Sequence, residues 1–348
     1  MSNEYGYGNA SEADIDDGNV TDAYFLRTEE ALEEAGHDPY VRAEVTADQF
    51  SNGETEVFCG LKEVVHLLGE SDEYDGLPTH LYSIPEGAEF DGGPVMQIEG
   101  HYQDFARYET AILGLLSQAS GYATAAREVF TAAESTPVLS FGSRHIHPAM
   151  APYMERAAAI GGNNGYSNVG ASDVFEIEPS GTMPHALMLS FGRGNQEEAW
   201  SAFNEGVDDD TPRIVLVDTF SDEVDEARRA CFELGSDLDG IRLDTTGSRR
   251  GDFKHIIKEV SYELEQIGRD DVDIYVSGGI DAETVEELHS LVDGFGIGSA
   301  VTNADPIDFG LDIIEVDGEP ISKRGKLSGV KRSAMSQYID NGEVIREV

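Results

Sequence analysis

Short apolar runs alternate with helix-prone segments through the second half of the chain. Most of these runs are uninterrupted, as in strands buried on both faces, and alternation of strands with helices predicts a parallel sheet. Seven such repeats favour an incomplete β/α barrel over an open doubly wound sheet. The predicted strands are residues 138–141, 166–169, 181–185, 214–217, 240–244, 274–276 and 294–297.

The first part of the chain has a different pattern. Residues 1–18 are rich in Gly, Asn, Ser and Asp and predict an acidic flexible tail. Residues 21–35 predict a helix that stops at Gly36. Residues 43–100 form short alternating runs with frequent turn residues, which predicts a small β-rich fold. A long amphipathic helix follows over residues 103–131.

These patterns predict an α/β protein with two domains. A smaller, β-rich α+β N-terminal domain covers residues 19–118, and residues 305–348 are expected to pack back on it as short strands. Residues 119–304 form the incomplete seven-stranded β/α barrel, which is expected to carry the active site.

Acidic residues dominate the composition. The chain has 68 Asp and Glu against 23 Lys and Arg, a formal net charge of −45. The acid is spread along the chain, which indicates a salt-adapted, halophilic surface rather than a binding tail. Such a charge repels phosphate backbones and excludes nucleic acid as a partner. Hydrophobic residues make up 40% of the chain, which is enough for a core.

The cysteines and the apolar runs further restrict the class of protein. Cys59 and Cys231 form no paired motif, so we expect neither a disulfide framework nor structural zinc. No apolar run has the length of a membrane span, and the N-terminus lacks a signal pattern. We expect a soluble, cytoplasmic protein without a membrane partner.

Two predicted strand ends in residues 273–299 are rich in Gly and Ser and lie one helix apart. Backbone N–H groups can approach phosphate oxygens at glycines, because no Cβ stands in the way. We therefore predict a phosphate site at the top of the barrel; the alternative is a pair of ordinary strand-to-helix turns. The residues at these ends are Ser277, Gly278, Gly279, Gly298 and Ser299.

The other predicted strands also end in polar side chains. In a β/α barrel these positions face the active-site mouth, and the groups present suit a phosphate, a sugar hydroxyl, a carboxylate or a metal ion. In chain order they are Arg144, His145, His147, Asn168, Thr182, His185, Asp218, Thr219, Arg242 and Asp244.

Several of these residues also suit simpler roles. His145 and His147 lie two positions apart without an evident third ligand, which favours anion binding over metal ligation. His185 also suits a helix start. Asp218 and Asp244 suit helix caps, a role compatible with binding ribose hydroxyls or Mg²⁺-bound water.

Basic residues are scarce and gather in two clusters. An anionic substrate on an acidic protein needs a locally positive approach, so the clusters either guard the site mouth or form a solvated face. They are Arg249, Arg250, Lys254 and His255, and then Lys323, Arg324, Lys326, Lys331 and Arg332.

Five motifs in sequence order resemble nicotinate phosphoribosyltransferase, in an archaeal-like form. They are Phe141-Gly-Ser-Arg-His-Ile-His-Pro148, Ser180-Gly-Thr-Met-Pro-His185, Val217-Asp-Thr-Phe220, Gly240-Ile-Arg-Leu-Asp244 and Ser277-Gly-Gly279. Two earlier runs, Thr21-Asp-Ala-Tyr-Phe25 and Ala106-Arg-Tyr-Glu-Thr110, fit the same family. The resemblance covers residues 19–332.

The resemblance implies a type II phosphoribosyltransferase that works as a homodimer or higher homo-oligomer. The implied reaction joins nicotinate to 5-phosphoribosyl 1-pyrophosphate, giving nicotinate mononucleotide and pyrophosphate in NAD salvage. ATP is a co-substrate in the family, coupled through a phosphorylated histidine that matches His185. Thr182, Arg242 and Ser299 match substrate-contacting positions. Tyr24 matches an aromatic residue that stacks on the pyridine ring in a neighbouring subunit's site.

The chemistry adds further expectations. Breaking the C1–pyrophosphate bond leaves an oxocarbenium-like centre, so the pyrophosphate needs neutralisation and the ring nitrogen needs positioning. Mg²⁺ on the substrate phosphates, with Asp218 and Asp244 as possible ligands, would help the first. Arg144 would face the nicotinate carboxylate in bidentate geometry. We expect catalytic roles for His185, Asp218 and Arg242, and substrate binding by Tyr24, Arg144, His145, His147, Thr182, Thr219 and Asp244.

The sequence departs from the family at His145, where Arg is frequent, and it lacks the cysteine cluster of some archaeal relatives. Quinolinate phosphoribosyltransferase is the nearest alternative, but a second substrate carboxylate calls for a denser cationic lining. Nicotinamide would need no facing cation. A non-catalytic phosphosugar or nucleotide sensor would not need the histidine and both aspartates.

Overall fold

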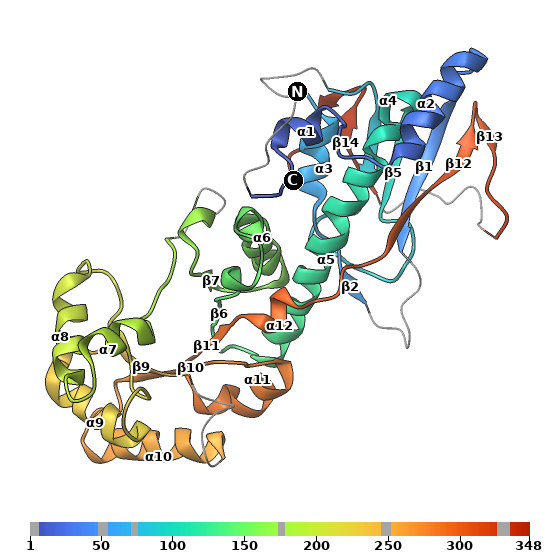
Figure 1. Cartoon of the computed structure of the whole chain (residues 1–348). Coiled ribbons are helices and arrows are strands. Elements are labelled where there is room, and N and C mark those ends of the chain that lie inside the picture. Colours follow the sequence, from blue (N-terminus) through green and yellow to red (C-terminus); the bar gives the residue numbers. More distant parts are fainter. Residues whose placement is uncertain (1–6, 48–54, 71–75, 173–177, 245–251, 326–334) are drawn as a thin grey trace. The chain divides into compact units, whose positions relative to one another are not determined.

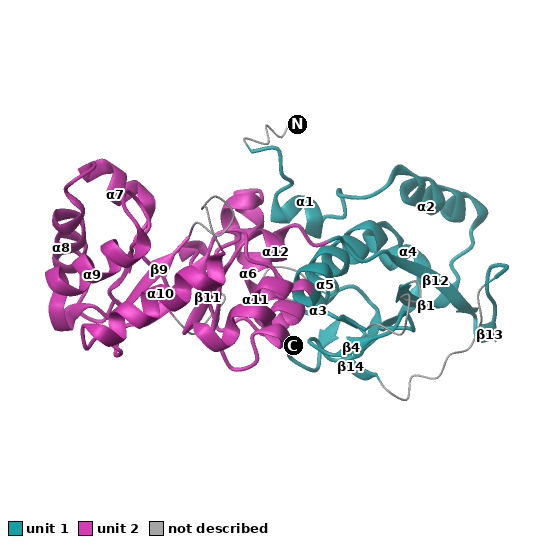
Figure 2. Cartoon of the chain, turned by 90° about the horizontal axis from the view of Figure 1, so that it is seen from below, with its two compact units in different colours: residues 1–124, 305–348 teal, residues 125–304 magenta. Residues whose placement is uncertain are grey.

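The computed structural model of the chain divides into two compact units (Figures 1 and 2). Residues 7–47, 55–70, 76–172, 178–244, 252–325 and 335–348 are described. Unit 1 comprises Met1–Thr124 and Asp305–Val348, and unit 2 comprises Ala125–Ala304.

Unit 1 is built on a seven-stranded antiparallel sheet with the order β13-β12-β1-β5-β3-β14-β15. Its strands are β1 (Tyr40–Ala47), β3 (His80–Ser83), β5 (Met96–His101), β12 (Phe309–Val316), β13 (Glu319–Pro320), β14 (Ser336–Asp340) and β15 (Glu343–Val344). A two-stranded sheet, β2 (Glu56–Val57) and β4 (Glu89–Phe90), accompanies it. The β-rich character predicted for the N-terminal part is thus confirmed.

The helices of unit 1 are α1 (Glu12–Asp16), α2 (Ala23–Ala35), α3 (Leu61–Leu68), α4 (Tyr102–Phe105) and the first part of α5 (Glu109–Ala132). Helix α3 buries Leu61, Val64 and Leu68 in a core that also contains Ile98 of β5 and Ile112 of α5. The helix predicted over 103–131 is therefore α5, preceded by the separate short helix α4.

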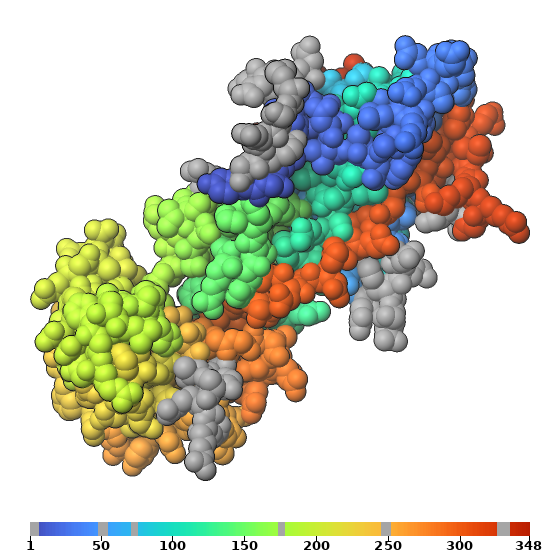
Figure 3. Space-filling view, viewed as in Figure 1, coloured from blue at the N-terminus to red at the C-terminus, as the bar shows by residue number. Residues whose placement is uncertain are grey.

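Two N-terminal helices lie near the surface of unit 1. Helix α1 falls within residues 1–18, where the sequence predicted a flexible tail, and Ser11 explains it by forming a capping box with Asp14. Helix α2 ends at Gly36, as predicted, with a left-handed φ of 60°. Phe25 is its buried residue, and the blue atoms of α2 are visible on the surface in Figure 3.

Unit 2 contains a six-stranded parallel sheet with the order β7-β6-β11-β10-β9-β8. Its helices connect the strands, which gives the α/β fold predicted from the sequence. The strands are β6 (Val138–Ser140), β7 (Gly165–Tyr166), β8 (Ile214–Leu216), β9 (Gly240–Leu243), β10 (Asp273–Ser277) and β11 (Gly294–Ile297). The helices are α6 (Ala151–Gly161), α7 (His185–Phe191), α8 (Gln196–Gly206), α9 (Glu223–Leu234), α10 (Phe253–Gln266), α11 (Ala282–Leu288) and α12 (Ser299–Thr302).

The seventh strand predicted at residues 181–185 is not formed, so the seven-stranded count is not confirmed in the described part of the chain. Instead, Ser180 N donates to the Tyr166 carbonyl (2.7 Å) and Met183 N to the Ile214 carbonyl (3.3 Å). Pro184 has no N–H with which to extend either ladder. An irregular segment therefore lies between the edge strands β7 and β8.

A buried carboxylate fixes the chain where it leaves β8. Glu226 of α9 is fully buried, and its oxygens accept the backbone N–H groups of Thr219, Phe220 and Ser221 at 2.8–3.0 Å. Gln196 Nε2 donates to the same carboxylate at 3.2 Å. Helix α9 thereby holds the loop that begins with Asp218.

Of the described residues, no helix combines the length and the apolarity that crossing a bilayer requires.

We expect Glu226→Leu to lower the free energy of unfolding by at least about 2 kcal/mol, because buried N–H groups left without an acceptor each cost about 1–3 kcal/mol. Glu226→Gln should lose less, since its amide oxygen still accepts. Urea unfolding of the purified protein in high salt measures both. Glu265→Gln on exposed α10 is the control, and an unchanged midpoint for Glu226→Leu would contradict the assigned role.

Candidate active site

The carboxyl ends of the parallel strands in unit 2 surround a cleft of about 1030 Å³. Loops after β6, β9, β10 and β11 line it, together with the start of α7. Twelve residues singled out from the sequence lie in its lining: Arg144, His145, Asn168, Thr182, His185, Arg242, Asp244, Ser277, Gly278, Gly279, Gly298 and Ser299.

Four other predicted residues lie outside this lining. Asp218 is behind His185 and contacts it directly. His147 Nδ1 instead accepts the Ala149 N–H at 3.2 Å. The Thr219 backbone is bound by Glu226, as described above. Tyr24 belongs to α2 in unit 1, where it is 56% exposed and donates to Asp22.

Two aspartates hold the imidazole of His185. Nε2 lies 2.9 Å from Oδ1 of Asp218, and Nδ1 lies 3.4 Å from Oδ2 of Asp244. Hydrogen bonds to Asp218 and then Asp244 raise the pKa of His185 to about 9, against the opposing effect of burial. The imidazole therefore carries a positive charge at neutral pH.

The same aspartates link neighbouring strand ends. Asp218 Oδ2 accepts the backbone N–H of Asp244 at 2.7 Å, and Asp244 accepts the Ser277 hydroxyl. Burial acts to raise the pKa of Asp244. Hydrogen bonds from His185 and Ser277, together with the charge of Arg242, outweigh burial and lower this pKa. Asp244 is therefore an anion that ties the ends of β9 and β10 to His185.

Arg242 is a buried cation whose two terminal nitrogens each donate a hydrogen bond. Its Nη1 donates to Ser277 Oγ at 3.1 Å and its Nη2 to the Met183 carbonyl at 3.0 Å. The guanidinium carbon lies 5.7 Å from the centroid of the Phe141 ring. Burial lowers the pKa of Arg242, but Arg remains protonated.

Arg144 differs from the buried Arg242 because it is exposed. It lies with His145 on the 3₁₀ turn η3 (Ser143–His145), and its Nε donates to His145 Nε2 at 3.3 Å. Its terminal amino groups extend beyond this bond, in the geometry that binds a carboxylate with two parallel hydrogen bonds. The cleft thus contains one fixed arginine and one accessible arginine.

The glycines after β10 allow close backbone approach. Gly278 has a φ of 91° and Gly279 a φ of 75°, in the left-handed region that disfavours other residues. A Cβ at Gly278 would collide with the Asp244 carbonyl. Any other residue here would disturb both the backbone and the aspartate that binds His185.

Some lining residues were not predicted as functional. Phe141 and Ser143 line the cleft, and both lie inside a run that the sequence had marked. Their position in this run was therefore a signal from which the sequence could have identified them as site residues. Ser167 gave no such signal, because it lies in the middle of an expected strand rather than at its end.

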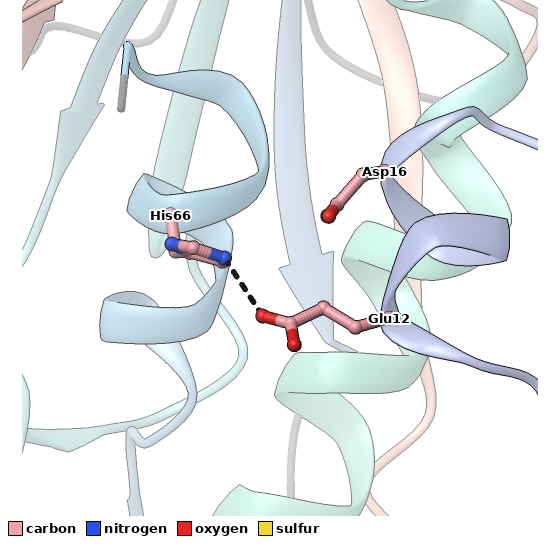
Figure 4. Close-up of side chains that lie close together, drawn as sticks. All are labelled: Glu12, Asp16 and His66. Atoms are coloured by element: carbon pink, nitrogen blue, oxygen red, sulfur yellow. Dashed lines mark ion pairs between the residues drawn. The ribbon is translucent and has the colours of Figure 1, made fainter. Parts of the chain in front are cut away.

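The described residues offer little for a metal ion in the cleft. Asp218 and Asp244 are the acidic pair there, and both bind His185. The group of three ligand atoms that lie within 4.8 Å of one another is in unit 1: Glu12, Asp16 and His66 (Figure 4). Glu12 is 80% exposed and forms a surface ion pair with His66 at 3.4 Å. Mg²⁺ in the cleft would fit best on substrate oxygens, with Asp218 or Asp244 at its edge.

Family models cover most of the chain. The model described as quinolinate phosphoribosyl transferase, N-terminal domain, matches residues 22–120, and that of the C-terminal domain matches residues 122–312. A solved structure of nicotinate-nucleotide pyrophosphorylase from Pyrococcus furiosus is 44% identical, with a TM-score of 0.91. It covers 100% of this chain and 94% of that one.

Curated relatives are named nicotinate phosphoribosyltransferase, which confirms the resemblance seen in the sequence. One from Mycobacterium tuberculosis is 28% identical over 73% of this chain and 58% of its own length. One from Bacillus subtilis is 30% identical over 61% of this chain and 43% of its own. The chain thus spans about half the length of the curated relatives it matches.

The imidazole of His185 should titrate near pH 9 in an NMR titration, well above its ordinary value of 6.5. Asp218→Asn should shift this pKa down towards 6.5, because it removes the anionic partner at Nε2. Asp225→Asn on the exposed face of α9 is the control. A titration near 6.5 in the unmodified protein would contradict the assigned hydrogen bonds.

The sign of the accompanying stability change follows from this pKa. Because folding raises it from 6.5 to about 9, the contribution of protonated His185 to stability is complete below about pH 6.5. It is lost as the pH rises through about 9. Urea unfolding should therefore show the stability advantage over His185→Gln shrinking across this interval.

Proposed function

The chain belongs to the quinolinate phosphoribosyl transferase family, and from this premise we propose that it is a nicotinate phosphoribosyltransferase of NAD salvage. It would join nicotinate to 5-phosphoribosyl 1-pyrophosphate, giving nicotinate mononucleotide and pyrophosphate. The relatives named nicotinate phosphoribosyltransferase support this reaction. The Pyrococcus furiosus relative is named for nicotinate nucleotide, the product proposed here.

The observation that carries the proposal is the set of groups at one cleft. Gly- and Ser-rich strand ends, the cationic His185 and the exposed Arg144 all line it. The 5′-phosphate would bind the backbone N–H groups of residues 277–279 and 298–299. The pyrophosphate would lie near His185, whose positive charge favours the leaving group.

The cationic lining favours nicotinate over its two alternatives. Arg144 and Arg242 are the arginines among the described lining residues, and no lysine accompanies them. Arg242 is already bonded to Ser277 and Met183. Arg144 thus suits one carboxylate, whereas quinolinate would present a second carboxylate to this cleft and nicotinamide would leave Arg144 without an anionic partner.

Protein groups and Mg²⁺ would have separate roles in the transfer of the phosphoribosyl group. As the C1–pyrophosphate bond breaks, positive charge develops on the ribose and negative charge on the pyrophosphate. Mg²⁺ held by the substrate phosphates would supply additional positive charge to the leaving group. Arg242 and Asp244 would keep His185 and Ser277 in place while Arg144 orients the pyridine ring.

ATP coupling through His185 belongs to the same proposal. Phosphoryl transfer to the imidazole requires a nitrogen without a proton, and the raised pKa of His185 opposes this at neutral pH. Asp218 at 2.9 Å is placed to accept that proton. ATP-dependent phosphorylation of His185 should therefore accelerate as the pH rises towards about 9.

Assembly and location complete the proposal. Tyr24 is exposed on unit 1, which suits a ring that completes the site of a second copy in a homodimer or larger homo-oligomer. The net charge of −45 suits a salt-adapted protein of the cytoplasm.

Purified protein in high salt, with Mg²⁺ and 5-phosphoribosyl 1-pyrophosphate, should convert nicotinate to its mononucleotide faster than it converts quinolinate or nicotinamide. Chromatography of the nucleotide products measures all three reactions. Product from quinolinate with release of CO₂ would identify the nearest alternative. Absence of product with every base would leave a phosphosugar sensor and contradict the enzyme proposal.

ATP should stimulate nicotinate turnover in the unmodified protein, and His185→Asn should abolish that stimulation because Asn offers no phosphorylatable nitrogen. Turnover is compared with and without ATP, and phosphate transfer is followed with γ-labelled ATP. Asp252→Asn at the exposed start of α10 is the control. Full ATP stimulation in His185→Asn would refute the phosphohistidine assignment.

A further inference from the structure

We propose that Glu155 is a positioning residue that holds the loop bearing Arg144 in the orientation that receives the carboxylate of the pyridine substrate. The inference rests on the proposed function, since it concerns how that same cleft recognises nicotinate. Glu155 itself is not among the residues that line the cleft. It would act on the substrate through Ser143 and the turn that this serine begins.

The side chain of Glu155 lies almost entirely inside unit 2. It projects from α6 and is 1% exposed. Its Oε1 accepts the hydroxyl of Ser143 at 2.6 Å. The carboxyl group thus binds the first residue of η3.

The other side of this loop is also confined. The Phe141 N–H donates to the Ile297 carbonyl at 2.6 Å, and a Cβ at Gly142 would collide with the Thr302 side chain. Thr302 Oγ1 lies 3.3 Å from His145 Nδ1. Helix α12 therefore supports the loop from one side, and the Glu155 carboxyl group holds it through Ser143.

The chemistry of the buried site points to a role beyond packing. Burial raises the pKa of Glu155, and the groups that oppose this rise are serine hydroxyls rather than a cation. A buried carboxyl group is costly to desolvate, whereas a leucine of similar size would fill the space without that cost. What the carboxyl group supplies, and leucine lacks, is an acceptor for Ser143.

The consequence for binding falls on Arg144. This residue follows Ser143 directly and is exposed at the cleft, with one hydrogen bond from its Nε to His145. Its side chain is long and exposed, so the direction in which it leaves the backbone depends on the geometry of η3. Releasing Ser143 would allow the turn to move and would weaken bidentate binding of a carboxylate.

The test compares Glu155→Leu, which removes the acceptor, with Glu155→Gln, which retains an oxygen acceptor in nearly the same shape. We expect Glu155→Leu to raise KM for nicotinate by about 5- to 10-fold, the effect of one lost hydrogen bond. KM for 5-phosphoribosyl 1-pyrophosphate should change less than about 2-fold, within ordinary surface-substitution effects. Glu155→Gln should restore most of the nicotinate affinity.

Two further variants make the result specific. In the double variant Glu155→Leu with Ser143→Ala, KM for nicotinate should rise no more than in whichever single variant has the larger effect. The two substitutions remove the same hydrogen bond, so their effects should not add. Glu44→Leu is the matched control: Glu44 is also a buried carboxyl group bonded to one side chain, Gln97, but it lies on β1 of unit 1. Its substitution should lower stability without changing the ratio of the two KM values.

Hydrogen–deuterium exchange supplies a readout independent of turnover. Amides of residues 142–147 should exchange faster in Glu155→Leu than in Glu155→Gln or Glu44→Leu. Unchanged exchange, or an equal rise in both KM values, would overturn the positioning role. If the unmodified protein has no activity with any base, the proposed function fails, while the exchange result still decides whether Glu155 fixes this loop.

Discussion

The placement of one imidazole between two carboxylates organises the site. Asp218 follows β8, Asp244 follows β9 and His185 begins α7, so their contacts join three elements that are distant in the sequence. Asp244 extends the connection to Ser277 at the end of β10. The carboxylates raise the pKa of the histidine and keep it protonated. Removing any member would leave a partly buried charge without its partner.

This interaction also reconciles a chain of very high negative charge with the anionic substrate proposed for it. Many acidic groups elsewhere face solvent, where salt screens them. In the cleft, two aspartates are neutralised by His185 and Arg242, which leaves Arg144 as the accessible cation. The local balance of charge at the strand ends, rather than the net charge of the chain, governs binding there.

The sequence predicted the parts of this arrangement that follow from chain order. Uninterrupted apolar runs located β6 and β8 to β11, and most of the polar residues singled out at strand ends line one cleft because parallel strands end on the same edge. The strand predicted at residues 181–185 is not formed. The run containing Met183 has the pattern of a strand, but Pro184 limits its hydrogen bonding. Glu155 and Glu226 could not be recognised, because an acidic residue on a helix is normally solvated and only tertiary packing shows that these two are buried.

The antiparallel sheet of unit 1 joins residues from the two ends of the chain. Val41 on β1 pairs with Val316 on β12, and β14 pairs with β3 near the C-terminus of the chain. During synthesis, the ribosome must therefore release nearly the whole chain before this sheet can be completed, whereas all strands of unit 2 have emerged earlier. The N-terminal strands would wait with unpaired edges exposed, a state prone to aggregation. The high net negative charge of the chain would keep such waiting chains apart by mutual repulsion.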